Sequence, residues 1–438
     1  MLSVKKIIVF GIAAFLLLII TGVAVYFLLF SKDDKKPIQV ITETKIKNVE
    51  LEIWGLFDDI SIYSPIINEY QKLHPEVTIS YKKMVFDDYE TNLINSIASG
   101  KGPDIFYFNN NWVYKHLDKI SPIKAQNVPS NRFIKATIDD FIKKGLVYGV
   151  PLNVDNLALF YNKDLFAIQG LSNPPRTWDQ FADYTQVLTK FSSDGKIIRS
   201  GASMGTFSNI NRAADILLTL MMQNRVDIFD FTTGKVAINK TVLSKEGEIN
   251  PSEDALRFYT DFANSEKKIY TWNDGFNYSI DAFTSGEVAM MFNYAYNISV
   301  IKDRAPYLNF GISQMPSQYK NSPITHSNYW ALSVSRNSLN SEVSWDFINF
   351  LTAEENYPKY FEKANVIPAQ QKFIDIKKTD PLLRPFIDQL IYSKTPYILD
   401  QAKVERILKQ AINAVTSGAL TTKKALEQAE DRLNLIIQ

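Results

Sequence analysis

The chain has 438 residues, of which 46% are hydrophobic and 22% are charged, so it can bury the cores of two lobes or domains. Its 48 basic and 47 acidic residues leave a formal net charge of +1, which provides no electrostatic footprint for nucleic acid or another polyanion. The absence of cysteine excludes disulfides, thiol nucleophiles, Cys-ligated zinc and a lipid-modified N-terminal cysteine. Any membrane attachment must therefore use the peptide itself.

Residues 7–30 form an uncharged and mostly apolar run near the N-terminus. As a helix this run would be about 36 Å long at about 1.5 Å per residue, which is enough to span a bilayer. It predicts one transmembrane anchor, preceded by a short cytoplasmic N-terminus at residues 1–6 and followed by a linker at residues 31–47. The alternative is a cleavable signal peptide, although the apolar part of such a peptide is usually only about 7–15 residues long.

An alternation of strand and helix patterns begins near residue 48. Val49, Leu51 and Ile53 alternate with polar or indole side chains, which predicts a strand. Helical spacing follows up to Leu73, and a second strand pattern and a second helical run lead to Gly100. This order is typical of an α/β fold with a mostly parallel sheet, whose ligands bind at the carboxyl ends of the strands.

The stretch Gly102 to Trp112 predicts a third, buried strand that ends in a polar cluster. Gly102 and Pro103 mark its start, and residues 105–108 are apolar enough to be buried on both faces. Residues 109–112, three asparagines and a tryptophan, then lie at the carboxyl edge of the sheet. One asparagine could cap a following helix. Three amides beside an indole also suit a neutral polyhydroxylated ligand, since amides donate and accept hydrogen bonds and the ring stacks on sugar C–H faces.

Several segments, taken in order, carry a resemblance to a known family. They are ASGKGPDIFYF (98–108), GLVYGVPLNVDNLALFYNKDLF (145–166), NPPRTWDQF (173–181), AFTSGEVAMMFNYAY (282–296), NFGISQMP (309–316), YWALSVSRNS (329–338) and TSGALTTKKALEQAEDRLN (416–434). Over roughly residues 48–438 the chain resembles the extracellular solute-binding proteins of ABC importers, in the group that binds maltose, maltodextrins and other sugars. Each segment alone is weak evidence for this family. The resemblance depends on their order and spacing taken together.

The resemblance implies a two-lobe α/β fold of the periplasmic-binding-protein type (type II), with a hinge and an interlobe cleft that closes on ligand. Mapped onto this chain, the first lobe would comprise about 48–152 and 312–350, and the second about 153–311 and 352–438. The implied protein is a monomer without a cofactor, anchored in the cell membrane with its soluble part on the extracellular face. Its partners would be a mono- or oligosaccharide and the permease subunits of an ABC transporter.

The resemblance also implies where ligand is bound. Asn111 falls at the position of a family carboxylate, Asp155 at the hinge carboxylate, and Tyr294 or Tyr296 at the sugar-stacking aromatic residue. An Asn in place of an acid, and Leu56 where a polar residue is common, argue against maltose itself. Each aromatic residue could instead belong to the core, and Asp155 could be a turn residue. The full predicted ligand-binding set is Trp54, Asp58, Asn109, Asn111, Trp112, Asp155, Trp272, Tyr294, Tyr296 and Trp330.

The sequence gives little support for an enzymatic function. Residues 201–205 match the G-x-S-x-G nucleophile elbow, but the predicted helix begins too late after the serine. A glycoside hydrolase would need two carboxylates about 5–10 Å apart, and no motif selects such a pair. Metal-ligand spacings and nucleotide-binding glycine loops are absent from the sequence. The sequence therefore predicts a non-enzymatic, carbohydrate-binding receptor of an ABC importer, with a ligand sensor or adhesin of the same fold, or a membrane-anchored glycoside hydrolase, as alternatives.

Overall fold

A computed structural model describes residues 48–245, 247–318, 324–397 and 400–437. Within these ranges no helix is both long enough and apolar enough to cross a bilayer. The predicted anchor at residues 7–30 and the predicted linker at residues 31–47 lie outside the described residues.

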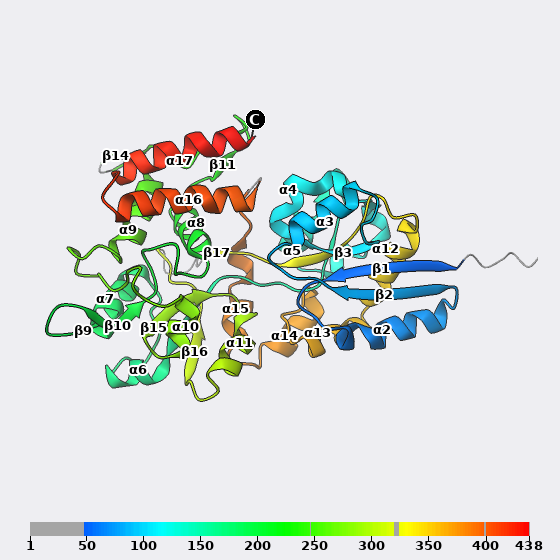
Figure 1. The fold of residues 1–438 in the computed structure, drawn as a ribbon, viewed down its shortest axis with the longest axis horizontal. Coiled ribbons are helices and arrows are strands. Elements are labelled where there is room, and N and C mark those ends of the chain that lie inside the picture. The colour runs from blue at the N-terminus through cyan, green and yellow to red at the C-terminus, as the bar shows by residue number, and fades with distance from the viewer. Residues whose placement is uncertain (1–47, 246, 319–323, 398–399, 438) are drawn as a thin grey trace, which may run out of the picture. The chain divides into compact units, whose positions relative to one another are not determined.

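The first of two central sheets has the strand order β2-β1-β3-β18-β7. Strands β1, β2 and β3 of this sheet are labelled in Figure 1. Strand β1 is parallel to β2 and β3, whereas β18 is antiparallel to β3 and to β7. The strands are β1 (Val49–Gly55), β2 (Val77–Lys83), β3 (Ile105–Asn109), β7 (Val150–Pro151) and β18 (Trp330–Val334), and the accompanying helices are α2 (Ile60–Leu73), α3 (Tyr89–Ala98), α12 (Ser341–Leu351) and α13 (Tyr357–Ala364). The predicted alternation of strands and helices up to Asn109 is confirmed.

The second sheet has the order β16-β8-β15-β10-β9. Its strands are β8 (Ala158–Asn162), β9 (Lys190–Phe191), β10 (Ile197–Ala202), β15 (Val288–Asn293) and β16 (Phe310–Ser313), with helices α6 (Lys163–Ile168), α7 (Trp178–Leu188), α8 (Ala213–Gln223), α9 (Pro251–Asp261), α10 (Ser279–Thr284), α11 (Asn297–Arg304), α16 (Gln401–Thr416) and α17 (Thr422–Ile437). Helix α7 packs on β10, α10 packs on β15, and α16 and α17 pack together and against α9 (Figure 1). Thr177 caps α7 by accepting a hydrogen bond from the backbone of Gln180.

The chain passes between the two sheets at three places. The first passage joins β7 to β8, and the second joins β16 to β18 and contains β17 (Thr325–His326). The third follows α13 and contains α14 (Ile374–Lys377), α15 (Arg384–Asp388) and β19 (Ser393–Lys394), which pairs with β17. Because α13 packs against α2, we propose that the first lobe extends to Ala364, beyond the boundary near residue 350 expected from the sequence.

Strand β3 is the buried centre of the first sheet, because β1 and β18 flank it and helices cover the sheet. All of its side chains, Ile105 to Asn109, are buried. Full burial of each large apolar side chain contributes about 1.5–3 kcal/mol to stability. Asn109, the last residue of β3, caps the short 3-10 helix η1 (Asn110–Trp112) by accepting a hydrogen bond from the Asn111 backbone. The capping role considered for one asparagine therefore belongs to Asn109.

Candidate functional site

Three aromatic side chains lie together at the edge of the first sheet where β1, β2 and β3 end. Phe57 follows β1, Phe86 follows β2, and Trp330 opens β18 opposite Asn109. Their ring centroids are 5.5 Å (Phe57 to Trp330), 6.2 Å (Phe86 to Trp330) and 6.0 Å (Phe57 to Phe86) apart. Phe57 is 47% exposed and Phe86 is 51% exposed. These two adjacent, half-exposed rings make this edge of the sheet a candidate binding surface. We call these three residues the aromatic platform.

Buried residues hold the platform in place. Trp112 packs edge-on against Trp330, with centroids 5.1 Å apart. Beneath them the Asp58 carboxylate accepts hydrogen bonds from Tyr107 at 2.5 Å and Tyr360 at 3.0 Å, which links the loop after β1 to β3 and α13. Burial raises the pKa of Asp58, while the two tyrosine hydrogen bonds oppose that rise. Asp58 and Trp112 therefore support the platform from below.

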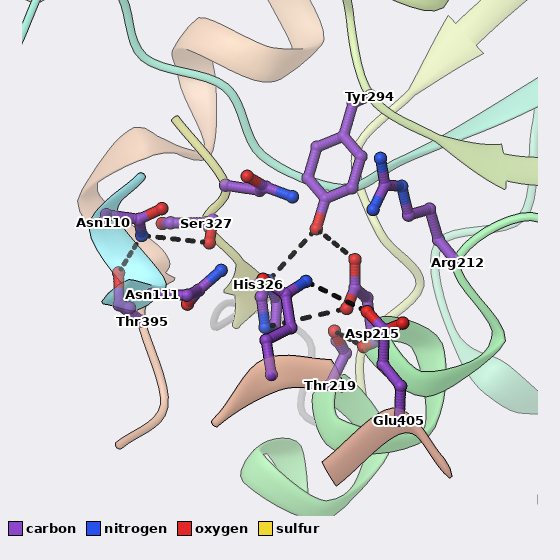
Figure 2. Close-up of polar contacts among 12 residues, drawn as sticks. Asn110, Asn111, Arg212, Asp215, Thr219, Tyr294, His326, Ser327, Thr395 and Glu405 are labelled. Carbon is purple, nitrogen blue, oxygen red and sulfur yellow. Dashed lines mark hydrogen bonds and ion pairs between the residues drawn. The ribbon is translucent and has the colours of Figure 1, made fainter. Parts of the chain in front are cut away.

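The three consecutive asparagines at the end of β3 and the start of η1 differ in their hydrogen bonding. The Asn109 side-chain amide, in addition to its capping bond, donates to Asn328 at 2.9 Å. The Asn110 amide donates to the Ser327 carbonyl and to Thr395 Oγ1, as Figure 2 shows. Asn111 is only 2% exposed, yet neither its Nδ2 nor its Oδ1 has a partner within the described residues. A buried amide without partners carries a desolvation cost of about 1–3 kcal/mol, which a ligand with hydroxyl groups would remove.

A second group of polar side chains lies at the edge of the second sheet. Arg212, directly before α8, donates from Nε and Nη2 to the Tyr296 hydroxyl at 3.2 and 2.7 Å. The Tyr294 hydroxyl donates to Asp215 at 2.8 Å and lies 3.1 Å from His326 Nδ1 (Figure 2). Tyr294 is fully buried, whereas Tyr296 is nearly half exposed. Of the two tyrosines after β15, Tyr296 is therefore the one that presents its ring at the surface.

Asp155, in the first passage between the sheets, organises the turn that carries Tyr296. Its two carboxylate oxygens accept hydrogen bonds from the backbone N–H groups of Ala295 at 2.9 Å and Tyr296 at 3.1 Å, and Oδ1 also accepts from Asn156 at 2.8 Å. Burial raises the pKa of Asp155 to about 7, against the opposing effect of these backbone hydrogen bonds. With its oxygens so engaged, Asp155 positions the turn.

The sequence matches the family model for bacterial extracellular solute-binding proteins over residues 65–385. The chain belongs to this family. Its relatives include the galactooligosaccharide-binding protein of Bacillus subtilis, 22% identical over 88% of this chain and 89% of that protein. A second relative is the sn-glycerol-3-phosphate-binding periplasmic protein UgpB of Pectobacterium atrosepticum, 23% identical over 68% of this chain and 67% of that protein.

Solved structures of solute-binding proteins share the fold. An ABC substrate-binding protein from Listeria monocytogenes, in complex with cycloalternan, has a TM-score of 0.74 at 20% identity, covering 89% of this chain and 99% of its own. A cyclo/maltodextrin-binding protein complexed with maltotetraose has a TM-score of 0.72 at 19% identity, covering 89% of this chain and 97% of its own. At these identities the likeness shows the two-lobe α/β fold, as expected from the sequence.

In this solute-binding protein, only some of the residues predicted to bind ligand lie at an accessible edge of either sheet. Trp272 is completely buried, stacks on Phe276 at 4.4 Å and donates its indole N–H to Asn209, so it offers no surface to a ligand. Trp54 is also buried, under the ammonium group of Lys82 at 5.2 Å. Trp272 therefore has the contacts of a core residue, whereas the buried indole N–H of Trp54 has no hydrogen-bond partner within the described residues.

Three residues at the sheet edges were not predicted as ligand-binding residues: Phe57, Phe86 and Arg212. Phe57 lies between two residues that were considered, Leu56 and Asp58. Phe57 could have been predicted from its position shortly after a strand, which is the reason that Asn111 was predicted. Arg212 has a different signature, since its backbone is left-handed with φ 64°, a conformation that is costly for a bulky residue.

Two substitutions at Arg212 separate the effect of backbone strain on stability from the effect of the guanidinium on ligand binding. We expect Arg212→Gly to unfold with a free energy about 1 kcal/mol higher than Arg212→Ala, because only glycine adopts this backbone conformation without strain. Both variants should bind ligand about ten-fold more weakly than wild type, because both lose the guanidinium beside Tyr296. Denaturant unfolding and calorimetry measure the two effects. Equal stability of the two variants would contradict the strain argument, and unchanged affinity would exclude Arg212 from the site.

Proposed function

We propose that this chain is a receptor that captures a carbohydrate between its two lobes and delivers it to an ABC importer. The observation that carries the proposal is the Asn111 amide, which has no partner within the described residues, at the same sheet edge as the half-exposed rings of Phe57 and Phe86. Arg212 and Tyr296 supply donors and a ring from the second lobe. The two lobes thus offer complementary chemistry for a polyhydroxylated ligand.

In this mechanism the platform stacks on the C–H faces of sugar rings while polar side chains orient the hydroxyl groups. Asn111 can both donate and accept a hydrogen bond, which matches a hydroxyl group. Stacking on Phe57 and Phe86 removes exposed apolar surface from water. Because a ligand held in this way touches both lobes only when they are together, its binding shifts the population toward the closed arrangement.

The names of the relatives point to two ligand classes, oligosaccharides and a phosphorylated glycerol. We propose a saccharide, because a platform of three rings suits a ligand with apolar ring faces. The rings of the platform offer nothing specific to a phosphate group, whereas Arg212 is a cation of the candidate site that could bind one. Glycerol phosphate is the comparison ligand in the test.

Isothermal titration calorimetry against neutral mono- and oligosaccharides, glycerol 3-phosphate and amino acids tests the proposal. It can use Val49–Gln438, which forms a compact unit of its own. We expect saturable binding of a saccharide, with Asn111→Ala reducing affinity about ten-fold because a buried hydrogen bond is worth roughly 1–1.5 kcal/mol. Binding of amino acids alone would contradict a carbohydrate ligand, and release of hydrolysis products would favour a glycoside hydrolase.

We further propose that residues 7–30 anchor the protein in the membrane, with the solute-binding part on the extracellular face. The length of this uncharged run and the extracellular character of the family support the proposal. Membrane fractionation at alkaline pH tests it, with a variant that lacks residues 7–30 as the control. Release of the native protein into the soluble fraction would contradict the anchor. Co-purification with permease subunits tests the partner.

A further inference from the structure

Three residues of the first lobe contact the segment that leads into α16. The Asn110 amide donates to Thr395 Oγ1 at 2.9 Å. The ring of Tyr114, on α4 (Val113–His116), lies 4.3 Å from the ring of Tyr397. The neighbouring Lys115 ammonium lies 3.1 Å from the carboxylate that begins α16, Asp400. We call these three pairs the latch.

Two residues on the segment side of the latch, Tyr397 and Asp400, are fixed to the second lobe. Tyr397 stacks on Phe229 of β11 (Phe229–Asp230), with centroids 4.1 Å apart, and packs edge-on against Phe231. Asp400 caps α16 by accepting a hydrogen bond from the backbone of Lys403. Since α16 packs against α8 and α17, any movement of the second lobe should carry Tyr397 and Asp400 with it.

The other side of the latch is fixed to the first lobe. The ammonium of Lys115 also pairs with Glu90 of α3 at 2.8 Å, so it bridges one carboxylate from each lobe. The ammonium of Lys143 lies 5.0 Å from the ring centroid of Tyr114. Asn110 also accepts a hydrogen bond from the Tyr329 backbone. Thr395 also donates to Asp140 of the first lobe at 2.8 Å, so the Asn110 pair would stay with the first lobe. Separation of the lobes would therefore break the Tyr114 and Lys115 pairs together.

We propose that the latch stabilises the closed arrangement and so sets ligand affinity without touching the ligand. The latch side chains are paired with one another and are not proposed to bind the ligand. The neighbouring residue Asn111, whose amide has no partner within the described residues, is the one proposed to contact it. A contact that forms only in the closed state raises the closed population, and apparent affinity follows that population. This inference rests on the proposed ligand-binding function, and its test therefore includes a readout that needs no ligand.

Because the chain contains no cysteine, two introduced cysteines can carry a donor and an acceptor dye for energy transfer. Leu339→Cys in the first lobe and Tyr307→Cys in the second use side chains that are almost fully exposed. In the full-length protein in detergent micelles we expect Tyr114→Ala to lower the closed-to-open ratio about three- to ten-fold, as loss of one aromatic pair predicts. Saccharide affinity should fall by up to the same factor, with an unchanged order of preference among sugars.

Phe191→Ala is the matched control, since Phe191 is 48% exposed, Tyr114 is 40% exposed, and the Phe191 ring stacks on Tyr270 within the second lobe. It should leave energy transfer and affinity unchanged, as should Tyr114→Phe, which keeps the ring. Wild-type energy transfer in Tyr114→Ala, or an equal loss in Phe191→Ala, would overturn the latch. If no saccharide binds the wild type while Tyr114→Ala still changes energy transfer, the proposed function fails and the latch stands.

Discussion

Replacement of both Phe57 and Phe86 with alanine is expected to weaken saccharide binding about 30- to 100-fold. Each ring is about half exposed, so each can stack on a sugar face while its other face rests on the protein. An aromatic stacking contact is worth about 1–1.5 kcal/mol, and two such losses correspond to roughly this factor at 1.4 kcal/mol per ten-fold. Isothermal titration calorimetry of the single and double variants measures the effect and its additivity.

The stability of the same variants separates binding from folding. Because the two rings remain half exposed, their removal should lower the free energy of unfolding by only about 1–2 kcal/mol, measured by denaturant titration. Phe57→Tyr should retain most of the affinity, since the ring is kept, and Phe191→Ala should retain all of it. Wild-type affinity in the Phe57 and Phe86 double variant would place the ligand away from the platform.

The fold was predictable where one periodicity dominates a segment. The two-residue alternation around Leu51 and the apolar run at residues 105–108 have no competing helical pattern, and both became strands of one sheet. The boundaries of the lobes were harder to predict, because a helix belongs to the lobe against which it packs. The sequence of α13 predicts an amphipathic helix but does not say which element its apolar face packs against, and in the structure that element is α2.

The candidate site was predictable at the level of the sheet edge and less so at the level of single residues. Asn109, Asn110 and Asn111 are chemically identical, yet the turn into η1 makes the first a cap, the second a bridge between segments and the third partnerless. Tyr294 and Tyr296 differ in the same way, since a hydrogen bond to Asp215 draws only the former into the interior. Such distinctions arise from contacts between segments far apart in the chain.

Asp155 is expected to matter more for stability than any other polar residue of the site. Asp155→Ala removes the acceptor of three backbone N–H groups and leaves them unpaired in a buried turn. We expect the free energy of unfolding to fall by about 2–3 kcal/mol at pH 8, because each unsatisfied buried group is costly. Saccharide affinity should fall as well, since the turn that carries Tyr296 loses its support.

Comparison of Asp155→Ala with wild type should also reveal how protonation of Asp155 changes the free energy of unfolding with pH. The pKa of Asp155 is about 7 in the folded protein, against about 3.9 in an unfolded chain. Between these values the folded state holds a proton that the unfolded state has released, so this group's contribution to stability is largest below pH 4 and declines as the pH rises to 7. The difference between wild type and Asp155→Ala should therefore be about 2 kcal/mol larger at pH 5 than at pH 8.

Denaturant unfolding of both proteins from pH 5 to pH 8 measures this difference, and the comparison cancels the titration of all groups that the two share. Asp155→Asn is the second variant, because it keeps a side-chain carbonyl acceptor but cannot titrate, and it should show the same pH trend as the alanine variant with a smaller loss. If the difference between wild type and either variant instead grew with rising pH, the folded protein would hold Asp155 ionised. The backbone N–H groups would then outweigh burial in setting its pKa.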